Sequence, residues 1–495
     1  MKLLLVFVNN RFRSMVPPNL LALENYVKQF GHQVKVFDTS FYSDTIDWGN
    51  YRGNIESGSY LRTDGAKYGI KVKHKSSSEE LLKTISLYKP DLIGFGVYSF
   101  TEKLADRLAI EIKKKFDSIP ILYGGIDPSL NPIKTLSKKW VDFVCIGEGE
   151  KPLLEMCDAI ENNRSLINIQ NIWSKKNGNI IKNGLRPRIN PNELALPNMD
   201  SYEKFQYYSP IEGNIYKLAM IEFGRGCPNS CSYCENRQIK KIYSEAKIHK
   251  FISHKTPRKF VDDCKYLIKK YGIEFFYIVD GTFLTMNDSV LEELSELYNK
   301  EVNKPFLCLT TIPSMSEKRI KLLKKMNCYQ VNIGIETANQ RYREEVLNRP
   351  KMTNEKIIKM FRLLHKYNIR SSAYNMIGLP WQNRKDVFET IELNRKCKPT
   401  RTNVNIYIPF PNITLTKRLI KEGYIDSNAD LSDENFVTID VPTEMNREEI
   451  SGLYKTFNLY CKIPKLMFPL LKICEKDNKA SRLIIKILRK IYLRG

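Results

Sequence analysis

Residues 224–234 have the sequence GRGCPNSCSYC, which places Cys227, Cys231 and Cys234 within eight residues. The stretch directly follows an apolar run at residues 219–223, which opens a series of expected strands and helices. A loop after a strand is where β/α barrels carry their catalytic residues. Three thiolates can bind three irons of a 4Fe–4S cube and leave the fourth iron open, as a catalytic metal centre requires. The spacing therefore predicts a catalytic 4Fe–4S cluster on these three cysteines.

The alternative for the three cysteines is a structural zinc site. Zinc would need a fourth Cys or His ligand nearby, and His249 and His254 lie in a different, Lys-rich context. The remaining cysteines are scattered along the chain, unlike the evenly bridged framework of a small secreted protein. The pattern favours a redox-active metal centre in a cytoplasmic protein.

Alternating apolar and amphipathic stretches surround the cysteine loop. Six expected strands lie at residues 219–223, 275–279, 306–309, 330–335, 372–377 and 404–408. Helical periodicity falls between most of them, for example at residues 258–271, 316–326 and 354–367. This alternation predicts a partial (β/α)6 barrel over residues 217–430, followed by a helical, basic region over residues 431–495.

An earlier series of the same kind occupies residues 1–162. Expected strands lie at residues 3–8, 33–37, 92–96, 119–124 and 142–146, and expected helices at 19–30, 79–88, 101–115 and 150–161. The alternation predicts a doubly wound parallel sheet, interrupted by a polar excursion at residues 44–78. A polar connector with weak strand signals, residues 163–216, links the two series. The predicted fold class is α/β.

Composition restricts the class of protein. The chain has 495 residues, 42% of them hydrophobic and 27% charged, as in a folded protein of two or three domains. No apolar run approaches the length of a membrane span, and the opening run is too short for a signal peptide. The net charge of +24 comes from lysines spread along the whole chain, without a basic patch interleaved with aromatic residues. No nucleic-acid partner is expected.

The spacing Cys-x3-Cys-x2-Cys, with Tyr233 before the last cysteine, resembles the radical S-adenosylmethionine (SAM) superfamily. The resemblance implies that the open iron binds SAM, and that reduction of SAM yields a 5′-deoxyadenosyl radical. An electron donor such as flavodoxin or ferredoxin would supply the reducing electron. Tyr233, Asp280, Glu336 and Arg349 match positions that bind SAM in the family. Asp280 follows the second barrel strand, and Glu336 ends the fourth. Many relatives carry two acidic residues where this chain has Asp280-Gly281, which puts the role of Asp280 in doubt.

Three glycine-containing loops follow expected strands of the first series, at residues 94–101, 123–128 and 147–150. Ligands of doubly wound sheets bind at this edge, and glycines allow a large, flat ligand to approach the backbone. No Gly-x-Gly-x-x-Gly follows the first strand, which argues against a dinucleotide. The loops resemble the flavodoxin-like, cobalamin-binding domain that precedes the barrel in one branch of the superfamily. The resemblance covers about residues 1–430 and implies a set of cobalamin-binding residues: Ser99, Thr101, Gly124, Gly125, Gly147, Glu148 and Gly149.

One departure from that branch concerns the cobalt ligand. The chain has no Asp-x-His-x-x-Gly motif, so the lower face of the cobalt is expected to be open or bound by water. Many members of the branch lack this motif, and some relatives have lost cobalamin while keeping the domain.

The resemblance implies cobalamin-dependent methylation of an unactivated carbon in a small-molecule or lipid-like substrate. A ring-forming or rearranging enzyme is the alternative. A transfer-RNA methylthiotransferase would need an N-terminal domain with its own cysteines, and the first cysteine here is Cys145. Intact cysteine and Glu336 motifs argue against a non-catalytic carrier. Five residues near expected barrel-strand ends are candidates for the substrate pocket or for ordinary strand positions: Thr310, Thr311, Tyr374, Asn375 and Tyr407.

The C-terminal residues 481–494 are expected to form one amphipathic helix. Its basic side chains at helical spacing are Arg482, Lys486, Arg489, Lys490 and Arg494. Its apolar side chains on another face are Leu483, Ile484, Ile487, Leu488 and Ile491. The helix either docks on the protein with its lysines in water or makes peripheral contact with an anionic membrane.

Overall fold

The computed structural model describes residues 1–12, 15–47, 53, 55, 57–58, 64–176, 178–427, 429, 431 and 441–493. The chain divides into two compact units. The first comprises Met1–Trp48, Asp64–Gly226 and Glu235–Phe276, and the second comprises Gly49–Thr63, Cys227–Cys234 and Tyr277–Gly495. The cysteine loop therefore belongs to the second unit, although the residues on either side of it belong to the first.

The first unit contains a seven-stranded sheet of order β2-β1-β3-β4-β5-β6-β7. Its parallel strands are β1 (Lys2–Phe7), β2 (Gln33–Asp38), β3 (Leu92–Gly96), β4 (Ile121–Gly124) and β5 (Phe143–Cys145). The order 2-1-3-4-5 is that of flavodoxin-like sheets and confirms the predicted doubly wound fold. The segment with weak strand signals adds an antiparallel hairpin at one edge, β6 (Ile172–Lys176) and β7 (Asn179–Ile181).

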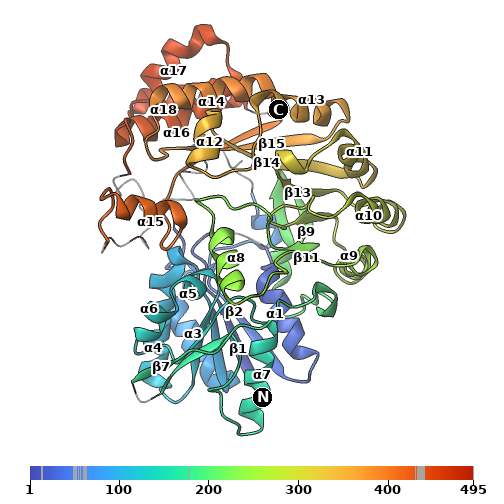
Figure 1. Ribbon diagram of the computed structural model, residues 1–495, viewed down its shortest axis with the longest axis vertical. Coiled ribbons are helices and arrows are strands. Elements are labelled where there is room, and N and C mark those ends of the chain that lie inside the picture. Colours follow the sequence, from blue (N-terminus) through green and yellow to red (C-terminus); the bar gives the residue numbers. More distant parts are fainter. Residues whose placement is uncertain are drawn as a thin grey trace. The chain divides into compact units, whose positions relative to one another are not determined.

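Helices cover both faces of this sheet (Figure 1). On one face α1 (Pro18–Lys28) and α7 (Glu150–Glu161) pack on a core that includes Leu5 and Cys145. On the other face α3 (Ser77–Tyr88) and α4 (Glu102–Lys115) pack on a core that includes Val6 and Tyr123. The two cores follow from strand geometry, because successive side chains point to opposite faces of a sheet.

A second seven-stranded sheet has the order β16-β15-β14-β13-β12-β9-β8. Six of its strands confirm the predicted β/α series: β9 (Asn214–Ile221), β12 (Phe275–Ile278), β13 (Phe306–Thr310), β14 (Cys328–Glu336), β15 (Arg370–Ile377) and β16 (Arg401–Ile406). Strands β13 to β16 pair in parallel. The first of the six begins five residues before the predicted start, because Asn214–Ile221 also pairs antiparallel with β8 (Tyr208–Ile211). The fold is an open, half-barrel type of sheet.

Helices between these strands begin at side-chain caps that the sequence supplies. They are α9 (Pro257–Tyr271), α10 (Asp288–Glu301), α11 (Glu317–Lys325), α13 (Asn354–Lys366) and α14 (Arg384–Cys397). Thr256, Asn287, Ser316, Thr353 and Asn383 each accept a hydrogen bond from a backbone N–H of the first turn. Such caps satisfy donors that a helix leaves unpaired at its start.

The C-terminal region is helical, as predicted, with α16 (Arg447–Lys462), α17 (Phe468–Cys474) and α18 (Lys479–Tyr492). Their buried side chains share a core with Val387 of α14 and Val404 of β16. Arg494 of the predicted tail helix lies outside the described residues. In the part of the chain that the structure describes, no helix is both long and apolar enough to cross a membrane.

Candidate cofactor sites

The cysteine loop of the second unit is held by the segment that follows β14. The backbone N–H of Ser232 donates to the carbonyl of Leu347 at 2.9 Å, and its hydroxyl donates to the carbonyl of Val346 at 2.6 Å. The side-chain amide of Asn348 donates to the carbonyl of Ser230 at 2.7 Å. These bonds are made by the loop backbone and the Ser232 hydroxyl, and none of them involves a cysteine sulfur.

The three cysteines differ in environment. Cys231 is buried, whereas Cys227 and Cys234 are partly exposed. Burial raises the pKa of the Cys231 thiol, and the nearby Arg349 guanidinium opposes that shift. The Sγ of Cys227 lies 3.5 Å from the Thr282 hydroxyl oxygen. Thr282 belongs to the motif after the second barrel strand, but it was not among the predicted site residues.

Tyr233, Glu336 and Arg349 come together in the second unit. The Tyr233 hydroxyl donates to Oε1 of Glu336 at 3.1 Å, and Nη1 of Arg349 lies 2.9 Å from the same oxygen. Nη1 also donates to the Tyr233 hydroxyl at 2.5 Å, while Nη2 donates to the carbonyl of Gly334 at 2.8 Å. The structure thus joins the residue before Cys234 to a buried ion pair.

Burial controls the electrostatics of this group. Glu336 and Arg349 are each 8% exposed. Burial raises the pKa of Glu336, and the Arg349 charge and the Tyr233 hydrogen bond oppose the rise. Among the residues that the structure describes, the buried Nε of Arg349 finds no hydrogen-bond partner. A buried donor without a partner is costly, so Arg349 fits a polar ligand at this place.

The backbone at Glu336 has an unusual conformation. Its φ is +66°, which is rare for a residue with a side chain. A side chain at Gly334 would displace the Glu336 carboxylate, because an added Cβ there would overlap its Oε1. Left-handed backbone of this kind clusters at functional sites. Asp280, the fourth predicted SAM-binding residue, is 4% exposed and lies two residues after the end of β12.

Two glycines leave a hollow at the carboxyl edge of the first unit's sheet. Gly96 of β3 and Gly124 of β4 are register partners on the face covered by α1 and α7. A Cβ built on Gly96 has no heavy atom within 4 Å, and one built on Gly124 meets only Cys145 Cβ, at 3.6 Å. Two adjacent positions without side chains form a cradle that added Cβ atoms would fill. This cradle fits the close approach of a bulky ligand such as cobalamin.

Other predicted cobalamin-binding residues are engaged within the first unit. Ser99 donates to Asp127 at 2.9 Å, and Thr101 donates to the carbonyl of Tyr98 at 3.1 Å. Gly125 has a φ of +109°, and an added Cβ would lie 2.7 Å from the Val97 carbonyl oxygen.

The loop at residues 147–150 is likewise packed within the first unit. Gly147 has a φ of +77°, and its missing Cβ makes room for the Tyr243 hydroxyl. A Cβ on Gly149 would lie 3.1 Å from a Leu23 methyl group. These neighbours are enough to explain both glycines, and the assignment of the predicted residues to cobalamin stays a prediction.

Glu148 belongs to an ion-pair cluster. Oε1 of Glu148 lies 2.7 Å from Nη2 of Arg188 and 3.4 Å from Arg225, which also pairs at 2.7 Å with both Glu150 and Glu222. Burial raises the pKa of Glu150, and Arg225 opposes the rise. Arg225 lies in β10 (Gly224–Arg225), which pairs with β11 (Ser253–His254). The cysteine loop thus follows a short strand of a two-stranded antiparallel sheet, not directly the first barrel strand as predicted.

The loop after β1 was not among the predicted ligand-binding loops. Asn10 donates to the carbonyl of Phe100 at 3.5 Å, while its buried Oδ1 accepts no hydrogen bond from the described residues. The Arg11 guanidinium lies 4.9 Å from the centre of the Phe100 ring. Loops after β1 and β3 border the switch point of a 2-1-3-4-5 sheet, where ligands bind. The sequence feature that could have indicated this loop is the pair of polar residues directly after the first strand.

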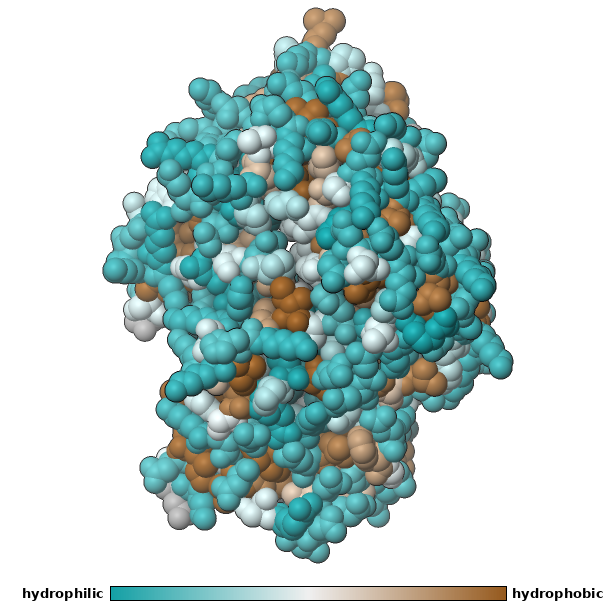
Figure 2. All heavy atoms as spheres, turned by 45° about the vertical axis from the view of Figure 1, so that its right-hand side comes forward, coloured by the Kyte–Doolittle hydropathy of each residue, from teal (hydrophilic) through white to brown (hydrophobic). Residues whose placement is uncertain are grey.

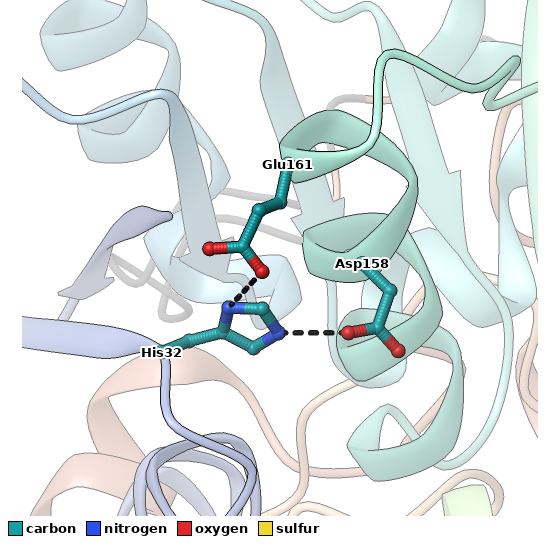
Figure 3. A group of neighbouring side chains, drawn as sticks. All are labelled: His32, Asp158 and Glu161. Atoms are coloured by element: carbon teal, nitrogen blue, oxygen red, sulfur yellow. Dashed lines mark hydrogen bonds and ion pairs between the residues drawn. The ribbon is translucent and has the colours of Figure 1, made fainter.

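His32, Asp158 and Glu161 form a cluster near the amino ends of the parallel strands of this sheet (Figure 3). His32 lies 3.0 Å from Asp158 and 3.6 Å from Glu161, and it directly precedes β2. The amino group of Met1 donates to Glu161 at 2.7 Å. This network supports the amino ends of the strands, and the glycine loops lie at the carboxyl ends.

Residues 221–393 match the family model described as the Radical SAM superfamily. These residues therefore form a radical SAM domain. The matched segment contains the cysteine loop, Asp280, Glu336 and Arg349. The domain implies a 4Fe–4S cluster and SAM as cofactors.

Proteins similar in sequence to this chain include methyltransferases and cyclases. The cytidylyl-2-hydroxyethylphosphonate methyltransferase of Streptomyces wedmorensis is 21% identical over 90% of this chain and 86% of its own length. The anaerobic magnesium-protoporphyrin IX monomethyl ester cyclase of Rubrivivax gelatinosus is 24% identical over 76% of this chain. The chain spans only 66% of the length of that cyclase. It spans 58% and 60% of the lengths of two other cyclases of the same description.

Solved structures share the fold over most of the chain. The cobalamin-dependent SAM radical enzyme OxsB, with aqua-cobalamin and SAM bound, matches with a TM-score of 0.67 and 15% identity over 98% of this chain and 70% of its own. The radical SAM methyltransferase TsrM of Kitasatospora setae, with tryptophan and a SAM analogue bound, matches with a TM-score of 0.65 and 17% identity. That match covers 86% of this chain and 77% of TsrM.

Proposed function

We propose that this radical SAM enzyme is a cobalamin-dependent methyltransferase acting on an unactivated carbon of a small-molecule or lipid-like substrate. The observation that carries the proposal is the cradle at Gly96 and Gly124, at the carboxyl edge of a 2-1-3-4-5 sheet. The same chain supplies a radical SAM domain. OxsB and TsrM, which share the fold, are described with cobalamin bound.

Each group in the proposed mechanism has a distinct task. The cluster, bound by Cys227, Cys231 and Cys234, would supply the electron that cleaves SAM, and cobalamin would carry the methyl group. Glu336 offers a buried carboxylate that accepts hydrogen bonds from ribose hydroxyls or an ammonium group. Arg349 holds Glu336 and Tyr233 in place and has a donor, Nε, left for the ligand. Asp280 is assigned to the amino group of SAM.

A ring-forming reaction is the second candidate function. Three magnesium-protoporphyrin IX monomethyl ester cyclases match this chain, at 23–24% identity. Such a reaction would use the radical without transferring a methyl group from SAM. The two candidates therefore differ in the fate of SAM.

The products of SAM distinguish the two candidates. Anaerobic protein reconstituted with iron, sulfide and cobalamin is incubated with SAM and a reductant, and the products are measured by mass spectrometry. We expect S-adenosylhomocysteine only from cobalamin-loaded protein, and 5′-deoxyadenosine with or without cobalamin. Abundant 5′-deoxyadenosine without S-adenosylhomocysteine from cobalamin-loaded protein would favour the ring-forming alternative.

Filling the cradle should remove cobalamin without unfolding the sheet. Gly96→Val and Gly124→Val add side chains where the protein leaves room, and neither glycine has a positive φ. We expect cobalamin affinity to fall about 10- to 100-fold, because overpacking costs about 1–3 kcal/mol. The ultraviolet–visible spectrum of anaerobically loaded protein, which should show base-off cobalamin in the wild type, measures occupancy.

Gly184→Val is the matched control for these variants. An added Cβ at Gly184 also meets nothing within 4 Å, and its φ is not positive. Gly125→Val should instead destabilise the fold, because its φ is +109° and Val97 blocks the added Cβ. Unchanged cobalamin binding in both cradle variants, or wild-type protein that refuses saturating cobalamin, would contradict the cobalamin assignment.

A further inference from the structure

Some apolar residues of helix α18 are buried against the protein, and others are exposed to solvent. Ile485 and Leu488 are each 5% exposed and pack in a core with Leu453 and Phe457 of α16. Leu483, Ile487 and Ile491 are 60%, 48% and 62% exposed. The helix is therefore docked on the protein by one side only. Its three exposed residues, spaced four apart, form the apolar stripe of α18.

Exposed hydrophobic residues concentrate around this stripe. Leu466 is 91% exposed, and Ile473 of α17 is 64% exposed. Half of the large hydrophobic residues exposed in the described part of the chain thus lie within residues 466–491. Figure 2 shows hydrophobic atoms projecting at the top of the view, in the region where Figure 1 places α17. Concentrations of this kind mark interaction sites, whereas single exposed residues are ordinary.

A basic stripe lies beside the apolar stripe on α18. It consists of the exposed residues Lys479, Arg482, Lys486 and Lys490, at steps of three and four residues. At 100° per residue, both stripes fall within about half of the helix circumference, on the side away from the core. Cations and apolar side chains therefore face the same way.

Acidic residues near α18 cancel this charge only in part. Residues 465–493 contain eight Lys or Arg and only two acids, Glu475 and Asp477. Glu475 pairs at 2.6 Å with Arg384, which lies outside this segment. Asp477 pairs with Arg482 at 2.7 Å and with Lys455 at 3.1 Å, and hydrogen bonds from both lower its pKa to about 2. Asp477 therefore offsets one of the four cations of the basic stripe, and the segment keeps a positive net charge.

We infer that the exposed side of α18, with Leu466 and Ile473, docks on an anionic lipid surface. A helix with adjacent apolar and basic stripes lies in the plane of a membrane interface, where apolar side chains enter the acyl boundary. Lys and Arg beside them reach back to lipid phosphates. A second copy of this chain would present the same positive charge, which disfavours pairing through this face.

Vesicle co-sedimentation of the reconstituted full chain tests this docking. We expect binding to vesicles of phosphatidylcholine and phosphatidylglycerol, and none to phosphatidylcholine alone. Each basic residue at an anionic surface contributes about fivefold in binding, so Lys479→Gln, Lys486→Gln and Lys490→Gln together should weaken it about 100-fold. Leu483→Ser, Ile487→Ser and Ile491→Ser together should weaken it by a similar factor or more. Salt at 1 M, where the Debye length is about 3 Å, should release the wild type.

Matched variants in the first unit control for general effects of charge and hydrophobicity. Lys83→Gln, Lys115→Gln and Lys139→Gln remove three exposed charges, and Leu87→Ser and Ile133→Ser remove hydrophobic residues that are 74% and 54% exposed. Both sets should bind like the wild type. Equal binding to neutral and anionic vesicles, or unchanged binding of both α18 variants, would overturn the inference. So would a wild-type dimer, seen by light scattering, that the apolar variant converts to monomer.

Discussion

Replacement of Cys227, Cys231 or Cys234 by Ala is expected to abolish both iron binding and 5′-deoxyadenosine formation. Each variant removes one of three protein ligands from a cluster that needs all three. Iron content should fall from about four atoms per chain to near zero, and 5′-deoxyadenosine formation by roughly 10³-fold or more, as for loss of an essential group. Iron assay and mass spectrometry of anaerobically reconstituted protein measure the two effects. The fold should persist, because the loop is held by backbone bonds of Ser232.

Cys264→Ala and Cys397→Ala are the matched controls. Both thiols are buried, in α9 and α14, and burial raises the pKa of Cys397 to about 12. Neither thiol lies in the cysteine loop at residues 224–234, so both variants should keep iron and activity. Similar behaviour of all five variants would show that the cluster is misassigned.

Arg349→Met should both destabilise the second unit and abolish SAM binding. It leaves the Glu336 carboxylate buried at 8% exposure without its counter-charge. Breaking a buried ion pair from one side costs about 3–5 kcal/mol. Urea unfolding measures this loss, and calorimetric titration of reconstituted protein with SAM measures binding.

The double variant Glu336→Gln, Arg349→Met separates stability from function. Removing both charges should restore most of the unfolding free energy, because no unpaired charge remains buried. SAM binding should stay lost, because the carboxylate and the guanidinium are both absent. As a control, Arg341→Gln removes a pair with Glu345 whose side chains are 84% and 60% exposed. It should cost no more than about 0.5 kcal/mol. Full SAM affinity in the double variant would contradict the assignment of this pair to SAM.

Local signals in the sequence determined the elements and the cluster. Apolar runs of strand length and helical periodicity located the parallel strands of both sheets, because these patterns depend on residues within one element. The cysteine spacing predicted the cluster for the same reason, since its three sulfurs lie in one loop. Strand ends then indicated which loops carry ligands, because carboxyl ends of parallel strands share one edge.

Only the tertiary structure decided which of the indicated residues meet. Tyr233 lies 103 positions from Glu336 and 116 from Arg349, and their contact depends on how the cysteine loop packs on the segment after β14. The cradle arises because strand register sets Gly96 beside Gly124, while Gly125 and Gly147 are required by neighbouring protein atoms. Helical periodicity could not show that α18 buries Ile485 and Leu488 but exposes Leu483, Ile487 and Ile491. Strand register and side-chain packing depend on residues that are far apart in the sequence. The pattern within one element does not show which other element it will pack against.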